Sequence, residues 1–223
     1  MRGEIVESCQ IYWYGIEGDR RYAFVRGDAD SNFPWLTARQ VPQMLAFTPR
    51  LRDPYDPLES PVDVKTPDGR IISINDERLR VTIQEQYGGP VHLMQLRRGA
   101  YDAMAVSIIS TSTVQQLSQS DDPRRYRANF VIELNDPVAF GEDRWIGARL
   151  QLGDRDHAVT LRLLRPAKRC KMICIDPDTQ AIDARQLEDC ATQHDAFAGV
   201  YCVPETIGDV RAGDVIYLAG DAR

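Results

Sequence analysis

The stretch IGARLQLGDRDHAVTLRLL, residues 146–164, shows the pattern that dominates the chain. Two short runs rich in aliphatic residues, Ile146–Leu152 and Ala158–Leu164, are separated by polar residues and a glycine. Runs of this length bounded by turn residues are typical of β-strands, whereas helical periodicity is rare along the chain. The stretch therefore predicts two consecutive strands in a protein that is mostly β.

Similar runs recur on both sides of this stretch. They predict further strands at Glu4–Tyr14, Arg21–Arg26, Arg70–Ile74, Arg80–Gln86, Asp102–Ile109, Asn129–Leu134, Cys170–Ile175, Val200–Pro204 and Val215–Leu218. Three segments are expected to be helical, namely Ala38–Ala46, Thr113–Gln119 and Ala184–Gln193. Residues 49–67 contain five prolines, too many for a central strand, so a surface excursion is expected there. The fold class is therefore mostly β (β/α+β) with a few short helices.

Composition excludes several classes of protein. The chain has 223 residues, 27 Lys plus Arg against 33 Asp plus Glu, and a net charge of −6, which disfavours binding to nucleic acid. No apolar stretch approaches the roughly 20 residues of a membrane-spanning helix, and no secretory signal is recognisable. The five cysteines lack the spacing of a disulfide framework, which suggests free thiols in a cytoplasmic protein. Binding to a membrane is not expected.

Cys170 is the cysteine whose surroundings suggest chemistry. Cys170 and Cys174 form a C-x3-C pair, but no other Cys or His pair completes a zinc site, and Pro177 replaces the third cysteine of a radical iron–sulfur motif. Cys170 follows Arg165, Lys168 and Arg169, and nearby cations favour the thiolate that is both nucleophile and metal ligand. The alternative is a core residue, because free cysteine is among the most buried residue types.

Three polar segments also allow two interpretations. The hydroxyl run Ser110–Thr113 lies where a strand is expected to end and a helix to begin, which suits either a helix cap or a phosphate. Arg124, Arg125 and Arg127 form either a basic patch or a solvated loop, and Asp102 alone is typical of a turn. The histidines are scattered and give no support to a Ser/His/Asp or zinc hydrolase; they are His92, His157 and His194.

Several segments, taken in order, resemble the family of MOSC proteins, named after the molybdenum-cofactor sulfurase C-terminal domain. The N-terminal half resembles the family's β-rich domain at residues 15–21 (GIEGDRR) and 37–44 (TARQVPQM). The second half resembles it at residues 124–132 (RRYRANFVI), 141–145 (GEDRW), 169–170 (RC) with 176–179 (DPDT), 199–201 (GVY) and 213–215 (GDV). The similarity covers nearly the whole chain.

The resemblance implies a MOSC β-barrel at residues 91–223, preceded by a β-rich (β-barrel) N-terminal domain at residues 1–90. It implies binding of the molybdenum cofactor (molybdopterin), with Cys170 at the position of the family's molybdenum ligand, as suits a soft thiolate. Asp102 matches an aspartate beside the metal. The remaining positions implied for the pterin and its phosphate are Arg20, Ser110, Thr111, Arg127, Asn129 and Arg169.

The chain departs from the family pattern at three places. Ala128 replaces a proline, and Gln180 replaces a glycine. Family members also carry a strand ending in Lys-Ser before the Arg-Gly-Glu that begins here at Arg2, and that lysine touches the cofactor. We therefore expect either a start upstream of Met1 or a weakened site and an incomplete first barrel.

The resemblance leaves three hypotheses open. The first is an oxidoreductase that reduces N-hydroxylated compounds, similar to the amidoxime-reducing component, with Cys170 and Asp102 as catalytic residues. The second is a carrier or sulfur-handling module that binds the cofactor without turnover, and the third is a fold that binds nothing. The first is favoured because a protein that serves only as a scaffold would need neither Cys170 nor Asp102. The chain lacks a nucleotide-binding fingerprint and an iron–sulfur spacing, so the electron donor is expected to be a separate ferredoxin or flavodoxin with its reductase.

Overall fold

The structure is a computed structural model that describes residues 1–117, 122–154 and 158–219. The chain divides into two compact units, each assembled from separate segments. Unit 1 comprises Met1–Ile5, Gly18–Asp102 and Ile175–Ile182, and unit 2 comprises Val6–Glu17, Ala103–Cys174 and Asp183–Arg223. The domain boundary expected at residues 90 and 91 stays a prediction. Among the described residues, no helix is long and apolar enough to span a membrane.

Unit 1 consists of two small antiparallel sheets and one α-helix. The first sheet has the order β4 (Thr48–Leu51), β5 (Val62–Lys65) and β6 (Ile71–Ser73). The second pairs β3 (Tyr22–Arg26) with β7 (Val91–Gln95). Apolar side chains from both sheets, from the 3-10 helix η1 (Pro42–Ala46) and from the α-helix share one buried cluster. This cluster is the hydrophobic core of unit 1.

The α-helix α1, Glu77–Tyr87, corrects the strand expected at Arg80–Gln86. The Asp76 side chain accepts the backbone N–H of Arg78 at 2.9 Å and caps the helix, and Gly88, at φ 81°, ends it. Leu79 and Ile83, one turn apart, are fully buried on the same side. The β-branched residues of this segment favoured a strand, but capping and packing of one helical face outweigh that preference.

The strand β5 corrects the surface excursion expected for residues 49–67. Val62 and Val64 of β5 are buried, and β5 is the central strand of its sheet, between β4 and β6. The prolines lie outside Val62–Lys65, where they remove no hydrogen bond from the central strand. The number of prolines in the region was therefore less informative than their positions.

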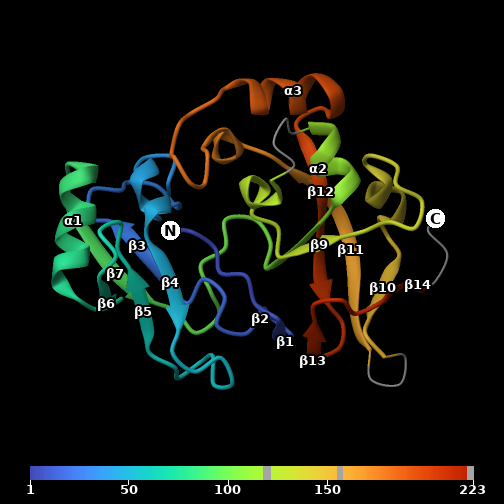
Figure 1. The fold of residues 1–223 in the computed structure, drawn as a ribbon, viewed down its shortest axis with the longest axis horizontal. Coiled ribbons are helices and arrows are strands. Elements are labelled where there is room, and N and C mark those ends of the chain that lie inside the picture. Colours follow the sequence, from blue (N-terminus) through green and yellow to red (C-terminus); the bar gives the residue numbers. More distant parts are fainter. Residues whose placement is uncertain (118–121, 155–157, 220–223) are drawn as a thin grey trace. The chain divides into compact units, whose positions relative to one another are not determined.

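Unit 2 is built on a curled six-stranded sheet (Figure 1). Its order is β14 (Ile216–Ala219), β10 (Arg149–Leu152), β11 (Val159–Lys168), β12 (Phe197–Pro204), β8 (Val106–Ser110) and β9 (Phe130–Ile132). All neighbours are antiparallel except β8 and β9, which are parallel. A smaller sheet, β13 (Gly208–Arg211), β1 (Ser8–Tyr12) and β2 (Gly15–Ile16), contributes to the same apolar core. The fold class is therefore mostly β, as predicted.

Short helices cover a second apolar cluster of unit 2. They are α2 (Thr111–Leu117), α3 (Arg185–His194) and the 3-10 helices η2 (Pro123–Tyr126) and η4 (Lys171–Cys174). A further 3-10 helix, η3 (Gly141–Trp145), follows Phe140, which packs against the same cluster. The cluster joins residues of α2, η2, η4 and α3 to the start of β12 and the end of β8. The helices near 113 and 184 are therefore present, although Ser118 and Gln119 lie outside the described residues. The strand expected at Cys170–Ile175 is wrong, since η4 occupies it.

Other boundaries also differ from the sequence expectations. The first strand covers Ser8–Tyr12 rather than Glu4–Tyr14, and the helix expected from Ala38 forms only as η1. Besides β5, the strands β2, β4, β7 and β13 were not predicted. The tetrapeptide of β13, GDVR, contains only one apolar residue, Val210, which is buried. Such a strand is stabilised by its pairing with β1 and leaves almost no pattern of its own.

Candidate functional site

Arg169 and Cys170 lie directly after β11, where the chain turns into η4. The backbone N–H of Arg169 donates to the carbonyl oxygen of Ala196 at 2.7 Å. The guanidinium donates from Nε to the carbonyl oxygen of Ala198 at 2.7 Å, from Nη2 to the same oxygen, and from Nη1 to that of Tyr126 at 2.8 Å. Arg169 therefore ties the end of β11 to β12 and to η2, and this holds the backbone of Cys170 in place.

The guanidinium of Arg169 is turned into the protein. Burial lowers its pKa from the ordinary arginine value, and the group lies 5.8 Å from the centre of the Tyr126 ring. Three of its hydrogen bonds go to backbone carbonyl oxygens. The cofactor contact implied for Arg169 stays a prediction, and the geometry shows a role in positioning its neighbour.

Cys170 differs from three other cysteines of unit 2. The thiols of Cys174, Cys190 and Cys202 are buried and donate to backbone carbonyl oxygens. Burial raises all three pKa values, that of Cys190 to about 11 and that of Cys202 to about 12. Cys170 is half-buried, and its sulfur has no hydrogen-bond partner among the described residues. Cys170 is therefore accessible to a ligand that the other three cannot reach; Cys9, also half-buried, lies on β1.

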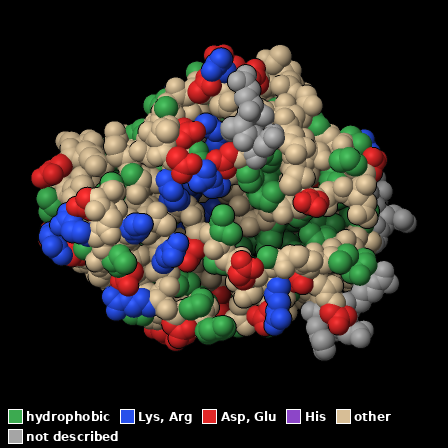
Figure 2. All heavy atoms as spheres, in the orientation of Figure 1, with side chains coloured by type: hydrophobic (Ala, Val, Ile, Leu, Met, Phe, Trp, Pro, Cys, Tyr) green, Lys and Arg blue, Asp and Glu red, His purple; other side chains and the backbone are tan. Residues whose placement is uncertain are grey.

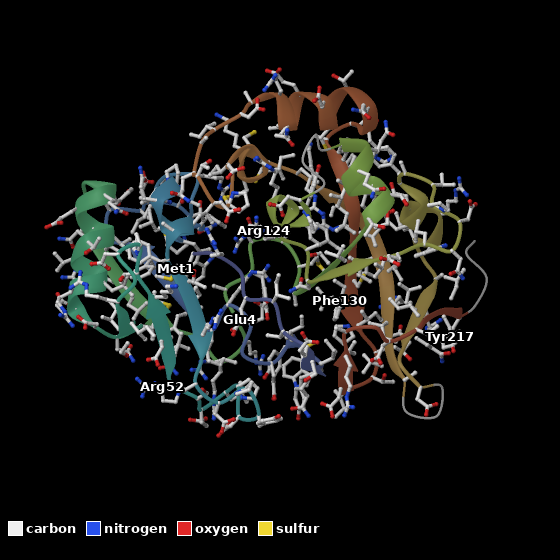
Figure 3. The ribbon with its side chains drawn as sticks, viewed as in Figure 1. Met1, Glu4, Arg52, Arg124, Phe130 and Tyr217 are labelled. Carbon is white, nitrogen blue, oxygen red and sulfur yellow. The ribbon has the colours of Figure 1, made fainter. Side chains whose placement is uncertain are left out.

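The arginine segment lies against η4. The 3-10 helix η2 packs on η4, and Arg125 Nη1 donates to the carbonyl oxygen of Ile173 at 3.5 Å. Arg124 is exposed and forms an ion pair with Asp122 at 2.8 Å. Arg127 follows η2 with a left-handed backbone, φ 52°. Figure 3 labels Arg124 and Phe130, which lie near the two ends of this segment. The structure thus brings the arginine segment and the Arg169–Cys170 pair together.

Asn129 connects this segment to the sheet. Its side-chain oxygen accepts the backbone N–H of Ser107 at 3.0 Å and the Ser107 hydroxyl at 3.2 Å. Its own backbone N–H donates to the carbonyl oxygen of Ser107 at 3.0 Å. Asn129 therefore aligns the start of β9 with β8, a structural role that accompanies the cofactor contact expected for it.

Ser110 is held by a buried carboxyl group. Its backbone N–H and hydroxyl donate to the two Glu142 oxygens at 3.1 and 2.7 Å, and the Thr113 hydroxyl donates to Glu142 at 2.9 Å. Ser110 Oγ also accepts the N–H of Thr113 at 3.1 Å, which makes Ser110 a cap of α2. Ser110 and Glu142 are fully buried, whereas Thr111 is half-buried. The geometry supports the cap interpretation, and the phosphate contacts of Ser110 and Thr111 stay predictions.

The other two expected site residues belong to unit 1. Arg20 forms an ion pair with Asp19 at 2.7 Å and lies 5.6 Å from the Tyr101 ring centre. Its carbonyl oxygen accepts the N–H of Ala100 at 3.0 Å. At Gly99, φ 74°, an added Cβ would come within 2.7 Å of the Asp19 carbonyl oxygen, so glycine is required for this contact. The structure therefore joins Arg20 to the segment ending in Asp102, whose side chain is exposed.

Glu142 is the residue that sequence reasoning missed. It lies in the GEDRW segment, whose sequence served only for the family resemblance, and it links η3 to the end of β8 through Ser110. Its neighbour Asp143 has its pKa raised by burial and lies 3.4 Å from His194, which stacks on Phe140. A buried glutamate needs hydrogen-bond partners, and the hydroxyl run at Ser110–Thr113 was the available signal. His157 lies outside the described residues.

The side chains fit a metal whose other ligands come from a cofactor. Within the described part of the chain, no group of three or more His, Cys, Asp or Glu residues could hold an ion unaided. Cys170 offers one soft, accessible sulfur, and the cationic Arg169 lies next to it. A single sulfur ligand beside positive charge suits a molybdenum ion already bound to an anionic organic ligand.

Comparisons with known proteins identify the family of the chain. The model of the MOSC domain matches residues 94–217. A search of curated proteins finds no match. Among solved structures, the YuaD protein from Bacillus subtilis is similar over 96% of this chain and 85% of its own, with 12% identity and a TM-score of 0.44. The MOSC match covers more than half of the 223 residues and links the chain to molybdenum-cofactor-related function. The chain belongs to the MOSC domain family.

Proposed function

We propose that this protein is a molybdenum-cofactor-binding oxidoreductase that reduces N-hydroxylated compounds. The observation that carries the proposal is the half-buried Cys170 thiol, which has no hydrogen-bond partner among the described residues, whereas the thiols of Cys174, Cys190 and Cys202 are buried and hydrogen-bonded. These three thiols are sequestered in the core, as is typical of structural cysteines. A ligand cysteine must be accessible, as Cys170 is.

Each of the candidate site residues has its own proposed role. Cys170 binds the metal, and Arg169 holds its backbone through Ala198 and Tyr126. Contacts to the pterin and its phosphate are assigned, from the family pattern, to Arg20, Ser110, Thr111, Arg127 and Asn129. When bound, the cofactor supplies a redox-active metal able to accept an oxygen atom from a substrate. Asp102, with its exposed carboxyl group, positions the substrate or delivers a proton.

The reaction requires electrons from another protein. Reduction of a hydroxylamine, R–NHOH, to an amine and water consumes two electrons and two protons. We propose a ferredoxin or flavodoxin with its reductase as the source, because the sequence contains no nicotinamide or flavin fingerprint.

Activity of protein made in a cofactor-competent host tests the proposal. The loaded protein should reduce an amidoxime with reduced viologen but not with a nicotinamide nucleotide alone, and adding a reductase with a ferredoxin should restore nicotinamide-driven turnover. The Asp102→Ala variant should lose activity while retaining molybdenum. A fully loaded protein that does not turn over with viologen would contradict the reductase proposal and favour a cofactor carrier.

A further inference from the structure

A row of cationic side chains on the outer face of β11 leads toward Cys170. Arg162, Arg165 and Lys168 are exposed, while the alternate residues of the strand point into the core; these are Val159, Leu161, Leu163 and Ala167. Register shifts after Leu163 and Pro166 adjust the alternation, so that Arg165 and Lys168 both remain outside. Lys168 is separated from Cys170 by one residue, and the row therefore ends beside the proposed metal ligand.

The end of the row away from Cys170 has a carboxyl partner, whereas the end beside Cys170 has none among the described residues. The Glu205 carboxyl group forms ion pairs with Arg149 at 2.5 Å and with Arg162 at 3.0 Å. Arg165 and Lys168 form no ion pair with any described carboxyl group. The protein has a net charge of −6, and Figure 2 shows positive and negative side chains interspersed on the face drawn. Two uncompensated cations next to Cys170 are therefore a local feature.

Two aromatic rings lie under these cations. Arg165 is paired across the strands with Tyr201 and lies 5.1 Å from its ring centre, and Lys168 is paired with Phe197 at 6.0 Å. Both rings are half-buried, and Leu164 beside them is 36% exposed. We call Leu164, Arg165, Lys168, Phe197 and Tyr201 the β11 surface. Its mixture of aromatic side chains, arginine and exposed apolar area is typical of protein–protein contacts.

We propose that the β11 surface is the docking site of an acidic electron-transfer protein of the ferredoxin class. The proposal rests on the proposed function, which requires an external donor of two electrons per turnover. Uncompensated cations attract an acidic partner and orient it, and electron-transfer complexes need only a small interface. A partner on this surface places its redox centre beside the end of β11, where Cys170 lies. Two successive one-electron transfers from reduced ferredoxin supply the two electrons that each turnover consumes.

Binding of an acidic [2Fe–2S] ferredoxin tests the proposal without depending on turnover. The Arg165→Gln/Lys168→Gln variant removes the two uncompensated charges. The Arg149→Gln/Arg162→Gln variant is a matched control, because it changes the net charge equally on the same sheet but removes the two partners of Glu205. At low salt, the first variant should bind ferredoxin about tenfold more weakly than the wild type, and the control should stay within about threefold. Wild-type binding should weaken as salt screens the charges.

The results separate the docking site from the proposed function. Equal weakening in both variants, unchanged binding in Arg165→Gln/Lys168→Gln, or equally tight wild-type binding of a basic cytochrome would overturn the docking site. Molybdenum content, measured on the same preparations, tests the proposed function separately. In loaded protein, the ratio of ferredoxin-driven to viologen-driven activity should fall in the Arg165→Gln/Lys168→Gln variant and not in the control; a constant ratio would overturn the docking site.

Discussion

The Arg169 guanidinium donates two hydrogen bonds to one oxygen, the carbonyl of Ala198, from Nε at 2.7 Å and from Nη2. This fixes the residue before Cys170 to the start of β12. The Arg169→Lys variant keeps a charge but cannot donate in this forked geometry, so we expect a loss of about 1.5–3 kcal/mol in the free energy of unfolding.

Urea unfolding measures this loss, and Arg185→Lys is the matched control. Arg185 is an exposed arginine paired with Asp183, so the control should change by at most about 0.5 kcal/mol. The Arg169→Lys variant should also retain less molybdenum than the wild type, whereas Arg185→Lys should retain as much. Equal stability of the two variants would show that the guanidinium does not anchor Cys170.

Glu142 gives a second stability test. Its buried carboxyl group accepts three hydrogen bonds from Ser110 and Thr113. In Glu142→Gln, one of the two accepting oxygens becomes an NH2 group, so the Ser110 and Thr113 hydroxyls must reverse their hydrogen bonds or lose a partner. We expect a loss of about 2–3 kcal/mol in the free energy of unfolding. The exposed Glu188→Gln is the control and should lie within about 0.5 kcal/mol of the wild type. A neutral Glu142→Gln would contradict the network.

The Cys202 thiol makes stability depend on alkaline pH. Burial raises its folded-state pKa from 9.0 to about 12, so the thiol stays protonated in the folded protein when the unfolded chain has already lost the proton. Its contribution is therefore complete below pH 9 and is lost as the pH rises toward 12. At pH 10 the loss is about 1.4 kcal/mol.

Comparing unfolding at pH 8 and pH 10 isolates this thiol. In Cys202→Ala the decrease between the two pH values should be smaller by about 1.4 kcal/mol than in the wild type. Val200→Ala, which shortens another fully buried side chain of β12, should keep the wild-type decrease. If the two variants show the same pH dependence, the thiol is not the cause.

Gln180 occupies a backbone conformation that favours glycine. Its φ is 62°, and the backbone N–H donates to the Asp176 carbonyl oxygen at 3.0 Å. Gln180→Gly should therefore raise the free energy of unfolding by about 0.5–1 kcal/mol, a shift of about 1–4 °C in the melting temperature. Ala181→Gly, where φ is not positive, should lower stability instead. Thermal unfolding of both variants decides the point: destabilisation by Gln180→Gly would contradict it.

The sequence predicted those parts of the fold whose local pattern agrees with their packing. The strands around 150 and 161 alternate between core and solvent and were recognised directly. At α1 the β-branched residues indicated a strand, and only the Asp76 cap and the burial of Leu79 with Ile83 reveal a helix. The β13 strand depends on pairing with a segment about 200 residues earlier, which no local pattern records.

The candidate site was predictable in its residues more than in its contacts. The Arg169–Cys170 pair and the arginine segment follow from the family motif, and the structure packs them together through η2 and η4. The inward direction of Arg169 and the Glu142 network depend on side-chain orientation and burial. Those properties arise only when β8, β12 and η3 are assembled.

Molybdenum content measured by elemental analysis tests the central claim, that Cys170 is the protein ligand of the metal. The wild type and the Cys170→Ser and Cys174→Ser variants should be produced in the same cofactor-competent host and checked for equal folding. We expect molybdenum in the wild type and in Cys174→Ser, whose altered thiol is buried, and little in Cys170→Ser. Equal molybdenum in all three folded proteins would contradict the assignment of Cys170.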